Sequence, residues 1–448
     1  MHIFTRKLIL GERVMYADGV SPVNCVFTVS LRGELSQERL RYALNKVQVK
    51  HPLLQARILS RRGRPYFLGD GSVPEISVRM VERVSGDNWQ NETEVEWGLP
   101  FDVTKGPLAR VVWLRSETIS ELILVCPHCI CDGATGVTLM REILLLLDQP
   151  EVMIGDYPVF QSVKEFIPRA VLDNRKGRLA AYLKSLVMRV LFSLRPIREK
   201  DMNGKDYAIR WRLGGEISEA LVGRCKSEEV TVHAVLCVAL LDAYRAIKKE
   251  DARGKVICPV DIRRYVREIR KDMMFAFAPI VELGEPAAGG GAAGDAAGRT
   301  GVEGAGFWDR CRQLKGDLAE KMATINAYEL LLHSEYYHPA AGKLIRWLCA
   351  DAGSHDLTFS NMGRLDIPDE YETFTVEAIY SPTVVFPWRN PTTMVVSSFR
   401  EQMDFAFVSN TGALRFEEAM AIKESMMQTL ENAGCFGKRL IDFVSHHS

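Results

Sequence analysis

The sequence lacks any excess of charge of one sign. Lys plus Arg and Asp plus Glu number 57 each among 448 residues, so the formal net charge at pH 7 is zero. A protein without a strong overall field has no general attraction for polyanions such as nucleic acid. We therefore expect no nucleic-acid partner.

Long hydrophobic runs are also missing. No apolar stretch reaches the roughly 18 residues that a membrane span needs, and residues 1–19 contain neither a long apolar core nor a small-residue cleavage site. The ten cysteines are scattered along the chain, which at this length is typical of reduced thiols in a cytosol. These absences predict a cytoplasmic protein without a signal peptide.

The composition is that of a folded globular protein, with 47% hydrophobic and 25% charged residues. A chain of this length can bury more than one core, so two domains are expected. Strand and helix patterns alternate in both halves, which predicts an α/β fold of the α+β type with two similar layers facing each other. We place an N-terminal domain at 1–165, a crossover segment at 166–204 and a C-terminal domain at 205–448.

Several local patterns predict particular elements. Residues 22–32 alternate apolar and polar side chains, as a strand does, and Ser36 can cap a helix that ends near His51. We also predict a strand at 53–58 and a helix at 325–350. Further strands are expected at 108–114, 120–126, 207–213, 256–262, 373–380, 393–400 and 403–409, and further helices at 136–147, 216–227, 231–247, 306–324 and 414–432.

The crossover segment is basic and apolar at once. Its cations are Arg175, Lys176, Arg178, Lys184, Arg189, Arg195 and Arg198. One interpretation is a helix over 169–198 that makes a peripheral contact with a membrane surface. The other is a connecting helix whose aliphatic face packs on a domain. A second unusual stretch, 285–304, is rich in Gly and Ala and is predicted to be a mobile loop; it has no Gly-Lys-Ser/Thr sequence for phosphate binding.

The stretch 121–147 carries the chemistry that the sequence offers. An apolar run leads to His128, Asp132-Gly133 follows four residues later, and an amphipathic helix comes next. A lone histidine is more often structural than catalytic. Here, however, a strand can present the imidazole at its end, where the neutral ring could take a proton from a hydroxyl or amine that attacks a carbonyl. Asp132 either orients this loop or pairs with a cation elsewhere in the chain.

Neighbouring sulfur ligands suggest two other sites. Cys126, His128, Cys129 and Cys131 contain a Cys-x-x-Cys overlapping a Cys-x-Cys, but no second pair of metal ligands follows at a suitable spacing. On a continuous strand, residues 126, 128 and 130 would share one face while 129 and 131 would point the other way. The same alternation argues against a cysteine nucleophile activated by His128, because neighbours in sequence on opposite faces of a strand rarely meet. We therefore expect no metal site.

The chain resembles a known superfamily, the chloramphenicol acetyltransferase-like and condensation-domain acyltransferases. The similar segments occur in the expected order over nearly the whole chain: 27–58 with its His-Pro-Leu-Leu turn, 100–108, His128-x-x-x-Asp132-Gly133, Pro259-Val260-Asp261-Ile262-Arg263 and Ser360-Asn361-Met362-Gly363. The last of these is similar to a segment that lines the family's shared cleft.

The resemblance implies two α/β sandwich domains with an active-site tunnel between them. In that tunnel His128 would be the general base, and Asp132 would be structural and pair with Arg263. Gly133 would keep the tunnel clear. Ser360 and Asn361 would contact the substrate and supply donors to the oxyanion. The donor would be an acyl thioester, either acyl-CoA or acyl-carrier protein, transferred to an alcohol or amine without a bound cofactor, by an enzyme that is a monomer by default.

Positions where the sequence differs from the family's motifs narrow the range of subfamilies that it resembles. Pro127 stands where peptide-forming condensation domains carry a second His, and no carrier or adenylation domain fits in the chain. The region 381–391 lacks the Asp-Phe-Gly-Trp-Gly of the plant enzymes. What remains is similar to free-standing alcohol or lipid O-acyltransferases. Two alternatives stay open: a condensation-like module that forms an amide or binds a carrier protein without turnover, and a lipid-surface binding protein.

Overall fold

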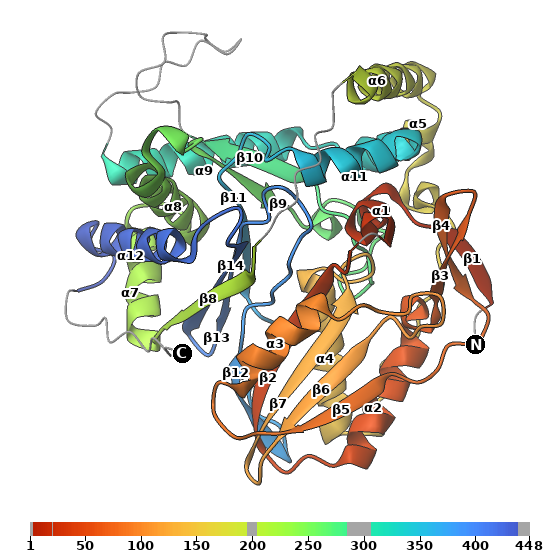
Figure 1. The fold of residues 1–448 in the computed structure, drawn as a ribbon, viewed down its shortest axis with the longest axis horizontal. Helices are drawn as coiled ribbons and strands as arrows, with labels where there is room; N and C mark the ends of the chain where they lie inside the picture. The colour runs from red at the N-terminus through yellow and green to blue at the C-terminus, as the bar shows by residue number, and fades with distance from the viewer. Residues whose placement is uncertain (1–2, 20, 195–203, 285–305, 438–448) are drawn as a thin grey trace.

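The computed structural model describes residues 3–19, 21–194, 204–284 and 306–437 (Figure 1). The Gly- and Ala-rich stretch at 285–304 lies outside these residues, as does 195–203 of the crossover segment. Three β-sheets and the helices packed on them form the described part of the chain, which is a mixed α/β fold as predicted.

The first large sheet has five strands in the order β12-β2-β7-β6-β5. Its bounds are β2 (Asn24–Gly33), β5 (Ser77–Glu82), β6 (Arg110–Arg115), β7 (Ile119–Pro127) and β12 (Phe374–Ile379). Four of these strands come from the first 127 residues, but β12 comes from the far end of the chain and pairs antiparallel with β2, Thr375 opposite Arg32. The sequence predicted a strand near 373–380 but not this partner.

Strand β7 is central in this sheet, and helices pack on both of its faces. Leu122 and Leu124 belong to the core under α2 (Gln37–Lys50) and α4 (Gly133–Asp148), and Ile123 and Val125 belong to the cluster that contains Trp89 and Trp97 of α3 (Asn88–Gly98). A strand buried on both faces needs a continuous apolar run rather than alternation. This explains why the sequence is so apolar just before His128.

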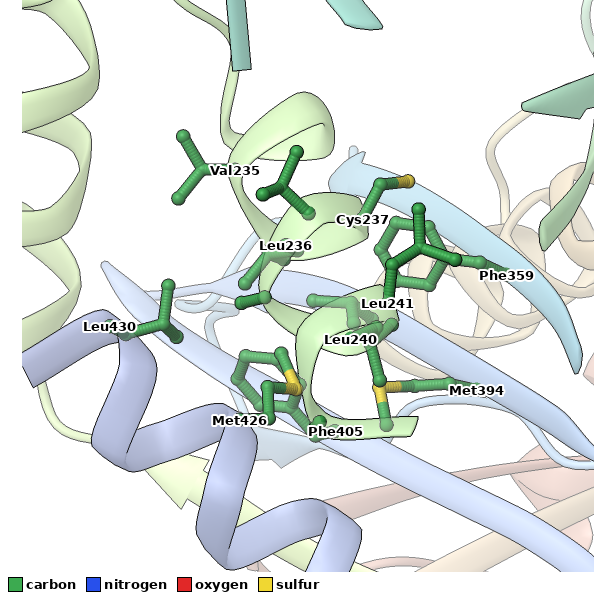
Figure 2. Close-up of a cluster of buried hydrophobic side chains, with 14 of the residues drawn as sticks. Val235, Leu236, Cys237, Leu240, Leu241, Phe359, Met394, Phe405, Met426 and Leu430 are labelled. Atoms are coloured by element: carbon green, nitrogen blue, oxygen red, sulfur yellow. The ribbon is translucent and has the colours of Figure 1, made fainter. Parts of the chain in front are cut away.

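The second large sheet has six strands in the order β10-β9-β11-β13-β14-β8. Helix α8 (Val232–Lys248) is buried along most of its length and packs against α12 (Phe416–Asn432) and against side chains from β11, β13 and β14 (Figure 2). Because α8 is apolar on nearly every side, it can only be stable inside a core. The strands are β8 (Asp206–Leu213), β9 (Lys255–Pro259), β10 (Ile280–Gly284), β11 (Leu357–Arg364), β13 (Thr393–Phe399) and β14 (Gln402–Asn410).

Two predicted elements differ from the structure. Residues 53–58 were expected to form a strand, but Pro52–Gln55 form a 3-10 helix and β3 (Arg57–Arg61) begins only afterwards, pairing with β4 (Arg64–Gly69). A short apolar run such as Leu53-Leu54 is buried in either conformation, so periodicity could not separate them. The predicted helix at 325–350 is divided into α10 (Ala327–Ser334), η6 (Glu335–Ala340) and α11 (Ala341–Ala350), with Pro339 in the middle segment. Proline has no N–H to donate and breaks a regular helix.

The 3-10 helix η3 (Val163–Phe166) leads into the crossover segment, whose described residues contain α5 (Arg169–Leu172) and α6 (Arg175–Leu194). Helix α6 lies at the edge of the molecule, beyond α11, at the upper right of Figure 1. No single helix in the described residues is long and apolar enough to cross a membrane, although α7 (Gly215–Ser227) and α8, with the short turn after it, meet those criteria together as a pair bent by 101°.

Candidate active site

His128 is the first residue after β7. Its backbone N–H donates to the carbonyl of Val23 at 2.7 Å, which fixes the turn at the strand end, and its side chain is half-buried. Within the described part of the chain the ring makes no hydrogen bond, and its Nδ1 is buried without a partner. A buried polar atom without a partner costs free energy, so such a ring is ready to bond a ligand or water.

An aromatic residue from the other end of the chain packs beside this ring. The centroids of His128 and Phe386 are 5.5 Å apart at a tilt of 36°, and Phe386 stacks on Trp388. Both aromatic residues pack against a small core between the halves that includes Val23 and Val384. Sequence reasoning missed Phe386. The signal was present, since two aromatic residues flank Pro387 in the segment 381–391, but nothing local indicates which partner they meet.

Asp132 is occupied on both oxygens. It is the N-cap of α4, where its Oδ1 accepts from the backbone N–H of Thr135 at 2.8 Å and from the Thr135 hydroxyl at 2.7 Å. Arg263 donates from Nη1 to Oδ2 at 2.7 Å and from Nη2 to Oδ1 at 3.2 Å. No hydrogen bond joins Asp132 to His128 in the described residues, so Asp132 does not fix the tautomer of that ring.

Arg263 lies in the turn after β9, and its side chain is only 2% exposed. It also donates to the carbonyls of Met273 and Phe275 and to Asp261 Oδ1. Burial raises the pKa of Asp132. The positive charge and hydrogen bonds of Arg263 and the hydrogen bonds of Thr135 lower it by more, so the pKa lies below its ordinary value of 3.8. The predicted pair is therefore a buried, bidentate link between the two halves of the chain.

Gly133 is where β11 approaches the motif. A Cβ at this position would lie 3.0 Å from Cε and 3.2 Å from Sδ of Met362. Met362 packs on the core of the first half, whereas Phe359 on the same strand belongs to the core of the second. Gly133 thus allows one strand to contact both cores beside the His128 loop.

Gly133→Val is expected to lower the free energy of unfolding by about 1–3 kcal/mol, because the added methyl groups would overpack against Met362. Gly133→Ala should cost less, since the unbranched end of Met362 can move aside. Urea unfolding of each variant measures the difference. Met362→Ala introduced into Gly133→Val should restore part of the loss; no restoration would mean that another contact limits this position.

Ser360 and Asn361 lie on β11, just before Met362. Both are half-buried, and the Asn361 Oδ1 accepts from the backbone N–H of Gly363 at 2.9 Å, across the irregularity in the pairing of β11 with β13. In the described residues no hydrogen bond joins either side chain to His128. The contact between Met362 and Gly133 brings this segment to the motif loop, but the oxyanion role of Ser360 and Asn361 remains a prediction.

The cysteines around His128 do not follow the strand alternation that we predicted. Strand β7 ends at Pro127 and residues 128–130 form a turn, so Cys126 and Cys131 meet after all. Hydrogen bonds from Cys126 and Cys25 lower the pKa of Cys131 to about 5, against the opposing effect of burial. The Cys131 side chain is nevertheless only 3% exposed, which does not suit a nucleophile that must reach a substrate.

A different group of residues could hold a metal. His233 and Cys237, four residues apart on α8, and Cys258 on β9 have ligand atoms that all lie within 4.8 Å of one another. The group is in the second half of the chain and includes none of the cysteines beside His128. Three donors provide an incomplete tetrahedral set.

Two cavities among the described residues do not include His128 in their lining. One, of about 610 Å³, is lined by Arg83, Arg212, Tyr380 and Arg400 among others. Ile119, at the opposite end of β7 from His128, also lines it. The other is a small space beside His51 and Tyr157. The substrate tunnel implied by the resemblance therefore remains a prediction.

Comparison with known sequences gives partial matches. No family model matches the chain. Surfactin synthase subunit 2 of Bacillus subtilis is 25% identical in an alignment of 212 residues that covers 46% of this chain. Cyclosporin synthetase of Tolypocladium inflatum is 24% identical in an alignment of 247 residues that covers 50% of this chain. The matched regions are only 6% and 2% of those much longer proteins.

Comparison with solved structures covers nearly the whole chain. The first condensation domain of the calcium-dependent antibiotic synthetase superimposes with a TM-score of 0.68 at 15% identity, over 96% of this chain and 97% of that one. The trichothecene 15-O-acetyltransferase of Fusarium sporotrichioides gives 0.64 at 15% identity, over 94% and 95%. The chain therefore has the two-domain fold that condensation domains share with chloramphenicol acetyltransferase-like acyltransferases, the superfamily that its sequence resembles.

Proposed function

We propose that the protein transfers an acyl group from a thioester, either acyl-CoA or acyl-carrier protein, to an alcohol. The observation that carries the proposal is the His128 ring, which is held at the end of a buried strand. Its buried Nδ1 has no hydrogen-bond partner among the residues that the structure describes. The fold supports acyl transfer or condensation in general. The choice of an alcohol rests on Pro127, which stands where peptide-forming domains carry a second His, and on the similarity to free-standing O-acyltransferases.

In the proposed reaction, the neutral imidazole of His128 accepts the proton of the acceptor hydroxyl as its oxygen attacks the thioester carbonyl. The C–O bond forms, and the tetrahedral intermediate carries its negative charge on the former carbonyl oxygen, where donors near Ser360 and Asn361 would stabilise it. Collapse breaks the C–S bond. The leaving thiolate takes the proton back from the imidazolium, so ester and free thiol are the only products and no acyl-enzyme forms.

A panel of acyl-CoA thioesters and acyl-carrier proteins, each mixed with alcohols of different length, tests this function. Thiol release followed with a colorimetric reagent should require both substrates, and mass spectrometry should detect the ester. Intact-protein mass spectrometry after incubation with donor alone should show no acylated chain. A stable acyl adduct would instead support a cysteine nucleophile.

A second candidate is a condensation-like module that forms an amide or binds a carrier protein without turnover. The observation in its favour is the partial similarity to two peptide synthetases. Turnover with amines but not alcohols would favour the amide. Binding of acylated carrier protein without turnover over the whole panel would favour the non-catalytic module.

A further inference from the structure

The side chains that helix α6 buries most fully against the rest of the molecule are small. The neighbours of the helix are α10, η6 and α11, and the residues that it buries are Ala181 and Ser185, each 2% exposed and one turn apart. Arg178 adds a hydrogen bond from Nε to the Tyr336 hydroxyl at 3.3 Å. Tyr182 adds a ring contact with Tyr336, with centroids 6.3 Å apart, and Leu186 and Met188 are half-buried. Other large apolar residues of the helix remain exposed.

Several large apolar residues of α6 point away from the body. Leu179, Leu183 and Val190 are 59%, 52% and 56% exposed. Since successive residues of a helix turn by about 100°, these three lie roughly opposite Ala181 and Ser185. We call this face the α6 ridge, made up of Leu179, Leu183, Val187 and Val190. Exposed apolar residues that gather on one face of a helix mark an interaction site.

The charges of α6 are all of one sign. The segment Arg175–Leu194 contains five cations and no Asp or Glu. By the same 100° spacing, Arg175 and Arg189 lie on one side of the ridge and Lys184 on the other. Lys176 lies within the ridge at its N-terminal end, and Arg178 lies next to the buried face, where it bonds Tyr336. An apolar ridge with cations at its borders is the arrangement of a helix that lies in the plane of an anionic membrane surface, with aliphatic side chains inserted and cations near the lipid phosphates.

We propose that α6 docks the protein onto an anionic lipid surface through the α6 ridge. Charge complementarity selects this occupant. In a symmetric dimer built on the ridge, the cations of one helix would lie close to the same cations of the other, which is unfavourable. A purely acidic protein partner would satisfy the charges but would leave the aliphatic side chains exposed. This docking is independent of the reaction proposed for His128.

Flotation of the full chain with vesicles tests the proposal. Wild-type protein should float with vesicles of phosphatidylcholine mixed with phosphatidylglycerol, should stay behind with phosphatidylcholine alone, and should be released by high salt. The variant Leu179→Ser/Leu183→Ser/Val190→Ser should lower the bound fraction at least tenfold. The variant Arg175→Gln/Lys176→Gln/Lys184→Gln should also lower the bound fraction. High salt should release this variant from the vesicles less than it releases wild type. All six side chains are exposed, so thermal unfolding should be unchanged.

Matched controls use exposed residues outside α6. Val49→Ser/Met80→Ser/Val84→Ser removes three other exposed apolar side chains, and Lys105→Gln/Lys205→Gln removes two exposed cations. Neither control should change flotation. The proposal is overturned if wild type does not float, if the controls lower binding as much as the α6 variants do, or if light scattering shows a dimer that the ridge variant abolishes.

Discussion

His128→Ala is expected to lower kcat for acyl transfer by about 10²- to 10⁴-fold, the range that a positioned general base contributes. The fold should survive the change, because the ring makes no hydrogen bond in the described residues and its removal leaves no buried group without a partner. The rate is measured as thiol release with a donor and alcohol pair that turns over in the panel. Thermal unfolding reports the fold in the same preparation.

Two further variants distinguish proton transfer by His128 from a role of this residue in positioning the substrate. His128→Gln keeps a polar side chain of similar length but cannot take a proton near neutral pH, so it should be as inactive as His128→Ala. His333→Ala removes another half-buried histidine, on α10, and should leave kcat unchanged. If His128→Gln retained most of the activity, His128 would position the substrate rather than act as a base.

Asp132→Ala is expected to lower the free energy of unfolding by about 3–5 kcal/mol, because it leaves the buried Arg263 guanidinium without its charge partner. Replacing both residues, as Asp132→Ala/Arg263→Met, should cost less than the two single changes added together, since no charge then stays buried alone. Urea unfolding measures all three. Asp102→Ala, which removes the carboxylate of the exposed pair with Lys105, should leave the urea midpoint nearly unchanged.

The same pair predicts a pH dependence. The pKa of Asp132 lies below 3.8 in the folded protein, so its ionised form stabilises the fold fully above about pH 4. This stabilisation is lost as the pH falls through the lower, folded pKa. The difference in unfolding free energy between wild type and Asp132→Asn should therefore be constant from pH 7 to 5 and shrink below pH 4. A difference that instead shrank above pH 5 would show that the pKa is not depressed.

The sequence allowed the motif to be predicted well because its signals are local. An apolar run predicts the buried β7 and an amphipathic stretch predicts the helix that follows, so His128 and Asp132 were expected on the loop that joins them. The cap that Asp132 forms on α4 was not predicted. Arg263 was a less local prediction. It came from the family resemblance, and the structure brings it to Asp132.

What the sequence could not supply depends on contacts between distant segments. Phe386 packs on His128, Met362 on Gly133 and Cys126 beside Cys131, and none of these pairs is marked by periodicity. The prediction that Cys131 points away from Cys126 assumed that the strand continued. It was wrong because β7 ends at Pro127. The sequence also left undecided whether the apolar side of α6 faces outward, because an apolar stripe on a helix does not show which side packs on the protein.

The origin of β12 affects how this protein is made. Until Phe374–Ile379 leave the ribosome, the edge of β2 that they cover has no strand partner and offers free backbone donors and acceptors to other chains. The first sheet can thus be completed only late in synthesis. Chaperones that bind nascent chains would have to protect the edge of β2 until then. Chimaeras between relatives should therefore exchange β12 together with the first half of the chain, although in the sequence β12 lies between β11 and β13 of the second large sheet.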